Sequence, residues 1–401
     1  MERMRSSSPS AQDWERSGMD ITSEIMKREE RAIMNTYTRQ PICLVRGSGA
    51  RVWDAEGNEY LDFVAGVAVN SVGHCHPRVV QAIKGQVERL IHTSNLYYTE
   101  NQVILAERLR ELSGMDKAFF CNSGAESVEA AIKLVRRAKD SASLVAAVGS
   151  FHGRTLGALG ITHKPAYREP FRPLNEARFV PYNEIEALKA AVDKDTAALI
   201  LEPVQGEAGV NVPDEDYLRA ARQICDDVGA MLIFDEVQTG FGRTGKWFGK
   251  DHSGVCPDLM TLAKAVAGGL PMGVMLASEE YSNVLQRGDH ASTFAGGPLL
   301  CASALAAIGA IEDEGLVERS REMGSYLRAR LEGLGQKEVR GLGLMVGLDI
   351  SIAAADVVSQ AREKGVLLNN TGEETIRMVP PLVVEVEQID RVVKVLAEIL
   401  E

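Results

Sequence analysis

Two polar side chains in one stretch of the sequence have the types and the placement for cofactor chemistry. Asp235 directly follows the apolar run 231–234, and Lys264 directly follows the apolar run 259–263. A lysine amine can bond covalently to a cofactor carbonyl, and a carboxylate can bind the nitrogen of a pyridine ring. A lone lysine is usually a solvated surface residue, but one set between an apolar run and a turn of small residues favours a functional role.

The two apolar runs are typical of buried strands in a parallel sheet. Ligands of such sheets bind at the carboxyl ends of the strands, so we expect Asp235 and Lys264 to face one crevice. Between residues 117 and 277 further apolar runs alternate with helical periodicity. This alternation predicts an α/β fold whose large domain has a mostly parallel sheet covered by helices on both faces.

Two other predicted strand ends carry groups that suit a ligand. Gly124 and Ala125 begin a predicted helix directly after a strand, and the unpaired N–H groups of such a corner can hold a phosphate. Phe151 and Arg154 follow another strand, where an aromatic face can stack on a flat ring and a guanidinium can bind a carboxylate. Each feature alone is more often structural, but together with the lysine and the acid they favour a ligand site.

Two competing motifs point to other classes of protein. The segment 240–246, GFGRTGK, has the glycine and lysine spacing of a nucleotide-binding P-loop, but Trp247 replaces the serine or threonine that binds magnesium. His74 and His76 flank Cys75 before a proline, and no third ligand with suitable spacing follows them. The sequence therefore predicts neither nucleotide hydrolysis nor a metal site.

Composition excludes several other classes. The chain has 401 residues, 25% of them charged and 45% apolar, with a net charge of -12. This charge argues against a nucleic-acid-binding protein, which would carry a basic face. No apolar stretch is long enough to span a membrane, and the first residues lack the apolar core of a signal peptide. Six scattered cysteines without a CxxC pair indicate reduced thiols and a cytoplasmic protein.

Periodicity and composition divide the chain into four parts. Residues 1–20, rich in serine and charge, indicate a disordered tail. Residues 21–70 contain a predicted helix and short strands separated by glycines, and we expect them to join a smaller domain. Residues 71–297 form the predicted large domain. Residues 298–401, in which long helices precede mixed strands and helices, form the predicted smaller α+β domain.

From about residue 34 the chain resembles the class III, pyridoxal-phosphate-dependent aminotransferases of fold type I. The resemblance rests on NTYTRQPICLVRG, YLDFVAGVAVNSVGHCHP, FHGRT, EPVQGEAGV, FDEVQTGFGRTG and LAKAVAGG, in this order. It implies that Lys264 holds the pyridoxal phosphate and moves protons, that Asp235 binds its ring nitrogen, and that Gln238 contacts its ring hydroxyl. It also implies that Phe151 stacks on the ring and that the corner at Gly124 and Ala125 binds the phosphate. Threonine is frequent in the family where Ala125 stands.

The resemblance further implies how substrates are bound. Arg154 is expected to bind a substrate carboxylate far from the ring. Arg377, in TIRMVPP, is expected to bind the carboxylate beside the reacting carbon of glutamate, and Glu207 to pair with it when that carboxylate is missing. The alternative is a permanent structural ion pair between Glu207 and Arg377. Tyr37 stands where a family member has a tyrosine that contacts the amine donor.

A loop around residues 290–297 resembles the family loop that reaches across a dimer interface. There the residue that matches Thr293 binds the partner subunit's cofactor phosphate, and the one that matches Ser292 contacts the substrate. We therefore expect a homodimer with shared active sites. Three loop positions differ from the family's usual Gly, Gly and Asn: Ala291, Ala295 and Gly297.

The implied activity is transfer of the ω-amino group of N-acetylornithine, or of a related ω-amino acid, to 2-oxoglutarate. The products are N-acetylglutamate semialdehyde and glutamate, in arginine biosynthesis. Ornithine, succinylornithine and carrier-linked lysine or ornithine stay open as donors. A nearer rival is an aminomutase, and the alternative of another class is an inactive, ligand-binding regulatory relative. The presence of both Lys264 and Asp235 argues against the inactive relative.

Overall fold

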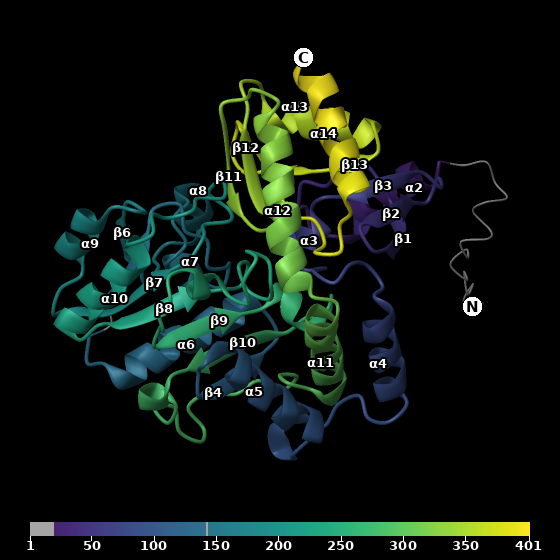
Figure 1. Cartoon of the computed structure of the whole chain (residues 1–401). Helices are drawn as coiled ribbons and strands as arrows, with labels where there is room; N and C mark the ends of the chain where they lie inside the picture. Colours follow the sequence, from purple (N-terminus) through teal and green to yellow (C-terminus); the bar gives the residue numbers. More distant parts are fainter. Residues whose placement is uncertain (1–19, 142) are drawn as a thin grey trace.

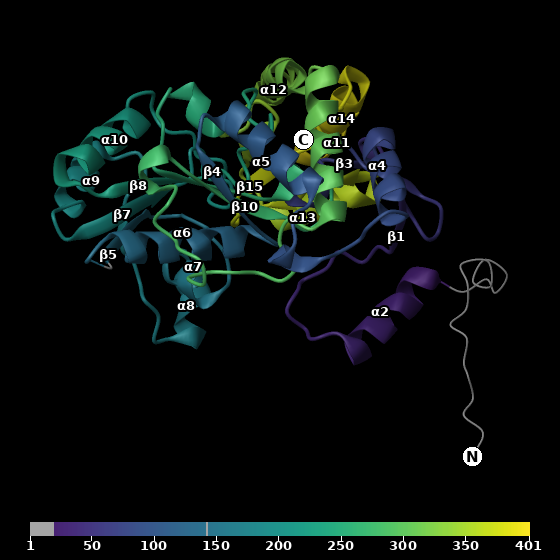
Figure 2. The ribbon, with the colours of Figure 1, turned by 90° about the horizontal axis from the view of Figure 1, so that it is seen from below.

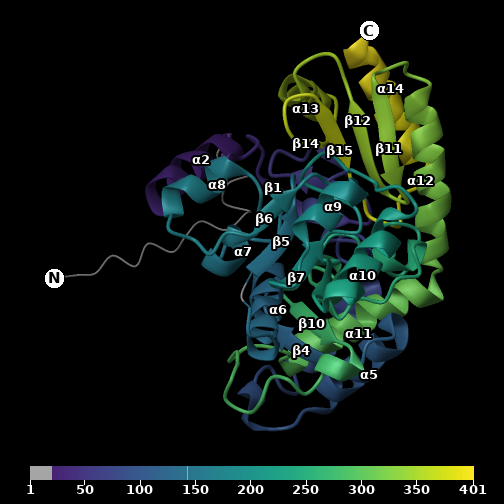
Figure 3. The same cartoon turned by 90° about the vertical axis from the view of Figure 1, so that its left-hand side faces the viewer.

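The computed structural model describes residues 20–141 and 143–401. The predicted disordered tail lies outside these residues except for Asp20, which caps the first helix, α2 (Ile21–Ala32). In Figure 1 a part built on the largest sheet lies below and to the left of a part that carries the C-terminus. Figure 2 shows that α2 projects away from both parts, whereas in Figure 3 it is seen at the edge of the molecule, overlapping α8 in that view.

The largest sheet has seven strands in the order β4-β10-β9-β8-β7-β5-β6. Strand β10 is antiparallel to both of its neighbours, and the pairs from β9 to β6 are parallel. The predicted α/β class with a mostly parallel sheet is thus confirmed. The strands are β4 (Lys117–Cys121), β5 (Ser143–Ala147), β6 (Arg178–Val180), β7 (Thr196–Leu201), β8 (Met231–Asp235), β9 (Leu259–Leu262) and β10 (Gly273–Ala277).

Helices cover both faces of this sheet, which explains why its central strands are apolar without alternation. In β8, Met231 and Ile233 pack in the cluster that contains α6, whereas Leu232 and Phe234 pack in the cluster that contains α9 and α10. Figure 2 shows α6 on one side of the strands and α9 and α10 on the other. These helices are α6 (Gly124–Ala138), α9 (Ile185–Ala191) and α10 (Tyr217–Val228).

A second group of helices packs beside the large sheet. The helix α11 (Pro298–Asp313) contacts both α4 (Pro77–Val87) and α5 (Glu100–Ser113), and Figure 1 shows the three together below the C-terminal part. The helix α11 begins at residue 298 but packs against helices of the predicted large domain, so the predicted domain boundary between residues 297 and 298 stays a proposal.

Short helices connect these elements. They are α3 (Ala65–Ala68), η1 (Ser94–Leu96), α7 (Leu156–Gly160), α8 (Pro165–Arg168), η2 (Glu169–Phe171), η3 (Gly249–His252), η4 (Lys264–Ala267) and η5 (Glu279–Tyr281).

The C-terminal part contains an antiparallel sheet in the order β11-β12-β15-β14. A second sheet, β1-β2-β3-β13, joins the N-terminal strands to the C-terminal part, because Val366 of β13 pairs in parallel with Leu61 of β3. The elements are β1 (Leu44–Ser48), β2 (Arg51–Asp54), β3 (Glu59–Asp62), α12 (Leu316–Glu332), β11 (Glu338–Leu342), β12 (Met345–Asp349), α13 (Ala354–Glu363), β13 (Val366–Leu367), β14 (Asn369–Asn370), β15 (Thr375–Met378) and α14 (Val386–Leu400).

None of the helices in the described ranges combines the length and the apolar character needed to cross a membrane.

Candidate active site

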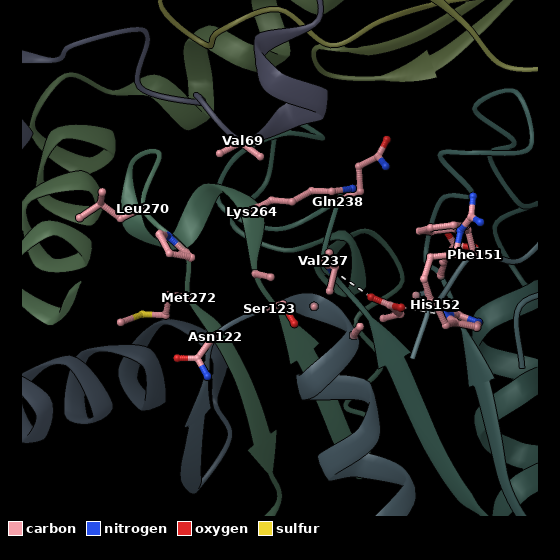
Figure 4. Close-up of a pocket in the computed structure, with 18 of the residues that line it drawn as sticks. Val69, Asn122, Ser123, Phe151, His152, Val237, Gln238, Lys264, Leu270 and Met272 are labelled. Carbon is pink, nitrogen blue, oxygen red and sulfur yellow. Dashed lines mark hydrogen bonds and ion pairs between the residues drawn. The ribbon is translucent and has the colours of Figure 1, made fainter. Parts of the chain in front are cut away.

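A cavity of about 540 Å³ lies at the carboxyl ends of the strands of the large sheet. Figure 4 shows side chains from several strand ends pointing into it. The topology thus places groups that are far apart in the sequence around one space, as expected for a parallel sheet. Seven of the predicted site residues line the cavity: Gly124, Ala125, Phe151, Arg154, Asp235, Gln238 and Lys264.

Lys264 lies just beyond β9 in an unusual backbone conformation. Its φ of 46° is in the left-handed region, which residues other than glycine rarely adopt, and such strain concentrates at functional sites. The side chain extends through the cavity toward Gln238 (Figure 4). Burial lowers the pKa of Lys264 to about 8, against the opposing effect of Glu207. A sizeable fraction of this amine is therefore neutral, and nucleophilic, near physiological pH.

Asp235 ends β8 and is held at the cavity by two hydrogen bonds. Its Oδ1 accepts a hydrogen bond of 3.1 Å from the backbone N–H of Val237, and its Oδ2 lies 2.7 Å from Nδ1 of His152. The carboxylate is almost completely buried. It is thus fixed in one orientation, next to the cavity, as the binding partner of a ring nitrogen requires.

The neighbouring acid, Glu236, serves the loop behind the strand instead. Its carboxylate accepts hydrogen bonds from the backbone N–H groups of Gly249, at 2.8 Å, and Lys250, at 2.7 Å, and from the hydroxyl of Thr239. Burial raises its pKa to about 7. Of the two adjacent acids, it is Asp235 that lines the cavity.

His152 is a site residue that the sequence prediction missed. Its side chain is fully buried and lies against Asp235. Burial alone lowers the pKa of His152, but the hydrogen bond to Asp235 and the charges of Asp235 and Glu202 outweigh it and raise the net pKa. His152 therefore holds the Asp235 carboxylate in its orientation through this hydrogen bond. Its position within the FHGRT motif was the available sequence signal.

Glu202 is a second missed residue. It follows β7 and lines the cavity, and its Oε2 accepts a hydrogen bond of 3.2 Å from the backbone N–H of Phe151. Burial raises the pKa of Glu202 to about 7. It stands directly after an apolar strand, as Asp235 does, so the same sequence rule would have found it.

The start of α6 forms a corner suited to an anion. Ser123 caps the helix by accepting a hydrogen bond of 3.2 Å from the backbone N–H of Glu126. The N–H groups of Gly124 and Ala125, in the first turn, have no partner within the helix and carry partial positive charge. A Cβ atom on Gly124 would lie 2.9 Å from Cγ1 of Val237. The contact with Val237 therefore requires glycine at position 124. The free N–H groups of the corner can bind a phosphate.

The aromatic and cationic groups of the FHGRT motif also line the cavity. Phe151 is half-buried, and the guanidinium carbon of Arg154 lies 5.7 Å from the centre of its ring. The same carbon lies 3.5 Å from the centre of the ring of Tyr167, a contact that the sequence prediction missed. Stacking restrains the guanidinium while its N–H groups, which lie in its plane, stay available for a carboxylate.

Glu207 and Arg377 form an ion pair that connects the large sheet with β15. Nη1 of Arg377 lies 2.5 Å from Oε1 of Glu207 and also donates to the carbonyl of Gly206 and to Oε1 of Gln238, at 3.2 and 3.4 Å. Burial by itself raises the pKa of Glu207, but the charges of Arg377 and Lys264 lower it overall. The pair is thus formed beside the cavity in the single chain.

Five predicted site residues do not line this cavity. Glu207 and Arg377 lie beside it, and the other three lie elsewhere. The hydroxyl of Ser292 accepts a hydrogen bond of 2.9 Å from Nδ2 of Asn122, and Thr293 is exposed. Tyr37 is 69% exposed and lines a separate pocket of the N-terminal segment. Their roles remain predictions, and those of Ser292 and Thr293 concern a partner subunit.

The described groups fit a flat phosphorylated ring that carries a carbonyl. The start of α6 suits its phosphate, Phe151 suits its face, Asp235 suits a ring nitrogen and Lys264 suits the carbonyl. The cavity of about 540 Å³ that these groups line gives the ring and its phosphate room. Across residues 20–141 and 143–401 no group of three or more His, Cys, Asp or Glu side chains could hold a metal ion.

Comparisons with known proteins agree with this geometry. The model of the aminotransferase class-III family matches residues 32–400. A curated acetylornithine aminotransferase from Methanosarcina mazei is 55% identical over 379 residues, which are 93% of this chain and 95% of that protein.

Two solved structures share the fold. One is an ornithine aminotransferase from Toxoplasma gondii, described with partial occupancy of PLP at its active site; its TM-score is 0.92, with 33% identity over 98% of each chain. The other is an acetylornithine aminotransferase from Elizabethkingia anophelis, with a TM-score of 0.84 and 33% identity over 94% of this chain and 98% of that chain.

Proposed function

We propose that this chain, which belongs to the class III aminotransferases, transfers the ω-amino group of N-acetylornithine to 2-oxoglutarate with pyridoxal phosphate as cofactor. The products are N-acetylglutamate semialdehyde and glutamate, and the setting is arginine biosynthesis in the cytoplasm. The observation that carries the proposal is the Glu207–Arg377 ion pair, formed beside the cavity that holds Lys264. The 55% identity to an acetylornithine aminotransferase supports the choice of donor.

When bound, pyridoxal phosphate accepts the amino group of the donor and delivers it to the acceptor, and its protonated ring draws the electrons left by the broken C–H bond. Lys264 attaches the cofactor and then carries a proton to and from the substrate carbon. Asp235, oriented by His152, accepts the hydrogen bond of the ring nitrogen. Gly124 and Ala125 bind the phosphate, Gln238 contacts the ring hydroxyl, and Phe151 limits the tilt of the ring.

The two substrates place their carboxylates differently. N-Acetylornithine reacts at its δ-amine, so its carboxylate lies far from the ring, where Arg154 binds it. Glutamate reacts at its α-amine and brings a second carboxylate close to the reacting carbon, where Arg377 binds it. Glu207 neutralises Arg377 while the donor is bound and leaves it when glutamate or 2-oxoglutarate arrives. A buried guanidinium without such a partner would be costly.

The experiment that tests the donor is a panel of ω-amines assayed with 2-oxoglutarate. We expect the highest kcat/KM for N-acetylornithine, with N-succinylornithine, free ornithine and a carrier-linked donor at lower values. Glutamate formation is measured for each donor under the same conditions. A panel in which free ornithine or a carrier-linked amine exceeds N-acetylornithine would assign a different donor to the same site.

We further propose a homodimer with shared active sites as the active unit. Ser292 and Thr293 lie outside the cavity of their own chain, and their loop resembles one that reaches into a partner's site. Large apolar side chains are exposed near this loop, as expected for a surface that a partner subunit covers. They are Leu96, Tyr97, Tyr98 and Phe294, exposed by 83%, 70%, 100% and 64%.

Mixing two inactive variants tests this sharing. In a mixed dimer of Lys264→Ala and Thr293→Arg, one composite site contains neither lesion, so random mixing should restore up to about a quarter of the activity. The control is a mixture of Lys264→Ala with Asp235→Ala, in which both sites of every mixed dimer are damaged. Equal recovery in the two mixtures, or full activity of a sedimenting monomer, would contradict shared sites.

A further inference from the structure

The segment 240–246, which has the spacing of a P-loop, has no part in the proposed chemistry. Its residues from 240 to 245 are buried. Gly242 and Gly245 have φ values of 86° and 84°, and a Cβ atom on them would lie 3.2 Å from Leu382 and 3.0 Å from Arg321. The glycines therefore allow close packing of this loop against the C-terminal part of the chain, which leaves no open cradle for a phosphate.

Arg243 lies at the centre of this loop and is 1% exposed. Its Nη1 donates to the carbonyls of Leu344, at 2.9 Å, and Pro380, at 2.5 Å, and its Nη2 donates to the hydroxyl of Ser71 at 3.2 Å. None of these acceptors is a carboxylate, and burial lowers the pKa of Arg243 to about 9. Burying a cation without a counter-ion reduces the stability of the fold, so we expect Arg243 to have a function that offsets this cost.

The acceptors of Arg243 belong to segments that border the active site. Leu344 lies just before β12, and Pro380 lies just after β15, the strand that carries Arg377. Ser71 belongs to the N-terminal segment whose Val69 lines the cavity. One side chain thus fastens the loop that follows Asp235 to the end of the strand that carries Arg377.

The backbone of Arg243 strengthens this connection. Its carbonyl accepts hydrogen bonds from the N–H of Leu344, at 3.0 Å, and from the hydroxyl of Ser320 in α12, at 3.1 Å. The N–H of Leu344 also lies 3.2 Å from the Ser320 hydroxyl. Both the side chain and the main chain of Arg243 therefore hold the start of β12, which pairs with β15 next to Arg377.

Arg154 and Arg377, the two arginines expected to bind carboxylates, belong to different parts of the chain. Contacts between these parts, such as those of Arg243, decide how the two arginines lie relative to each other. Lys264 and Arg154 extend from the large sheet, whereas Arg377 extends from β15 of the C-terminal sheet. A molecule of 2-oxoglutarate must place its reacting carbon beside Lys264, where the cofactor would lie, and its adjacent carboxylate on Arg377. The distance between the two sheets at this point must therefore be fixed.

We propose that Arg243 is the positioning residue that holds Arg377 in reach of the carboxylate beside the reacting carbon of 2-oxoglutarate and glutamate. This inference rests on the proposed function of Arg377. It predicts that Arg243 acts on one half-reaction, although it touches neither substrate nor cofactor. N-Acetylornithine does not use Arg377, so its half-reaction should tolerate a shift of β15.

The test compares Arg243→Met and Arg243→Lys in the two half-reactions, followed separately by the absorbance of the bound cofactor. Arg243→Met should lower kcat/KM for 2-oxoglutarate roughly ten- to hundredfold, as expected for a small misplacement of a binding group. The half-reaction with N-acetylornithine should change by less than about threefold by the same reasoning. Arg243→Lys, which keeps the charge and one donor group, should recover part of the loss.

Two further variants make the result decisive. Val392→Ala, in the core of the C-terminal part, controls for lost stability and should not separate the two half-reactions. Ser71→Ala removes one contact of Arg243 and should give a smaller loss with the same selectivity, so it decides the question if Arg243→Met does not fold. Equal slowing of both half-reactions by Arg243→Met, or by Ser71→Ala in its place, would overturn the inference.

Arg377→Ala, measured in the same assay, separates the two ideas. If Arg377→Ala itself affects both half-reactions equally, the proposed function of Arg377 is wrong and the role of Arg243 falls with it. If Arg377→Ala is selective and the Arg243 variants are not, Arg243 is a structural residue only.

Discussion

Replacing Arg377 with alanine is expected to slow the half-reaction with 2-oxoglutarate by roughly thirty- to several-thousand-fold. The loss of one partner of a desolvated charge pair costs about 2–5 kcal/mol, and about 1.4 kcal/mol corresponds to a factor of ten. The half-reaction with N-acetylornithine should change much less, because its carboxylate lies at Arg154. Single-turnover absorbance measurements with each substrate separate the two effects. Glu207 would lose its partner in this variant, which adds a smaller defect common to both halves.

Arg154→Ala is the matched control for Arg377→Ala. Both substrates place their distal carboxylate at Arg154, so both half-reactions should slow. The contrast between a selective and a common defect distinguishes the two arginines without any assumption about absolute rates. If Arg377→Ala slows both half-reactions equally, the ion pair of Arg377 with Glu207 is structural and the exchange of partners is wrong.

Replacing Lys264 with alanine is expected to reduce turnover by roughly a thousandfold or more, because the proton-transfer group and the covalent anchor are both lost. In the unmodified protein, borohydride should fix pyridoxal phosphate on the peptide that contains Lys264, as mass spectrometry can verify. The alanine variant should give no such adduct. A reduced adduct on another lysine would show that the cofactor anchor has been assigned to the wrong residue.

The pKa of Lys264 gives this prediction a pH dependence. The neutral amine is the form that attacks the cofactor, and burial lowers its pKa to about 8. Attachment of pyridoxal phosphate to the cofactor-free protein should therefore accelerate as the pH rises toward 8 and level off above it. Glu207 favours the charged amine, so Glu207→Gln should move the midpoint to lower pH. A midpoint near 10.5, the ordinary value for lysine, would contradict a desolvated amine.

The positions of Asp235 and Lys264 were predictable because the topology of a parallel sheet decides where strand ends point. Each of these residues directly follows an apolar run, and in a buried parallel sheet such runs bring their carboxyl ends to one edge. Glu202 obeys the same rule after β7. His152 does not, because its role depends on a hydrogen bond to Asp235, whose position relative to the FHGRT motif is set by the strand order β8-β7-β5.

The role of the segment 240–246 was not predictable from its pattern. Its glycine and lysine spacing equals that of a P-loop, and the difference lies in what surrounds it. The acceptors of Arg243 come from Leu344 and Pro380, far along the chain, and no local periodicity encodes such pairings. The same holds for the parallel pairing of β13 with β3, which brings distant segments together through two residue pairs. Contacts of this kind follow from tertiary packing.

The most direct test of the proposed function follows the amino group itself. N-Acetylornithine labelled with a heavy nitrogen isotope at its δ-amine is incubated with 2-oxoglutarate and the purified protein. The mass of the glutamate formed is then measured by mass spectrometry. We expect the label to appear in glutamate and N-acetylglutamate semialdehyde to form in equal amount. Glutamate without the label, or no transfer from N-acetylornithine under conditions in which pyridoxal phosphate is bound to Lys264, would contradict the proposed function.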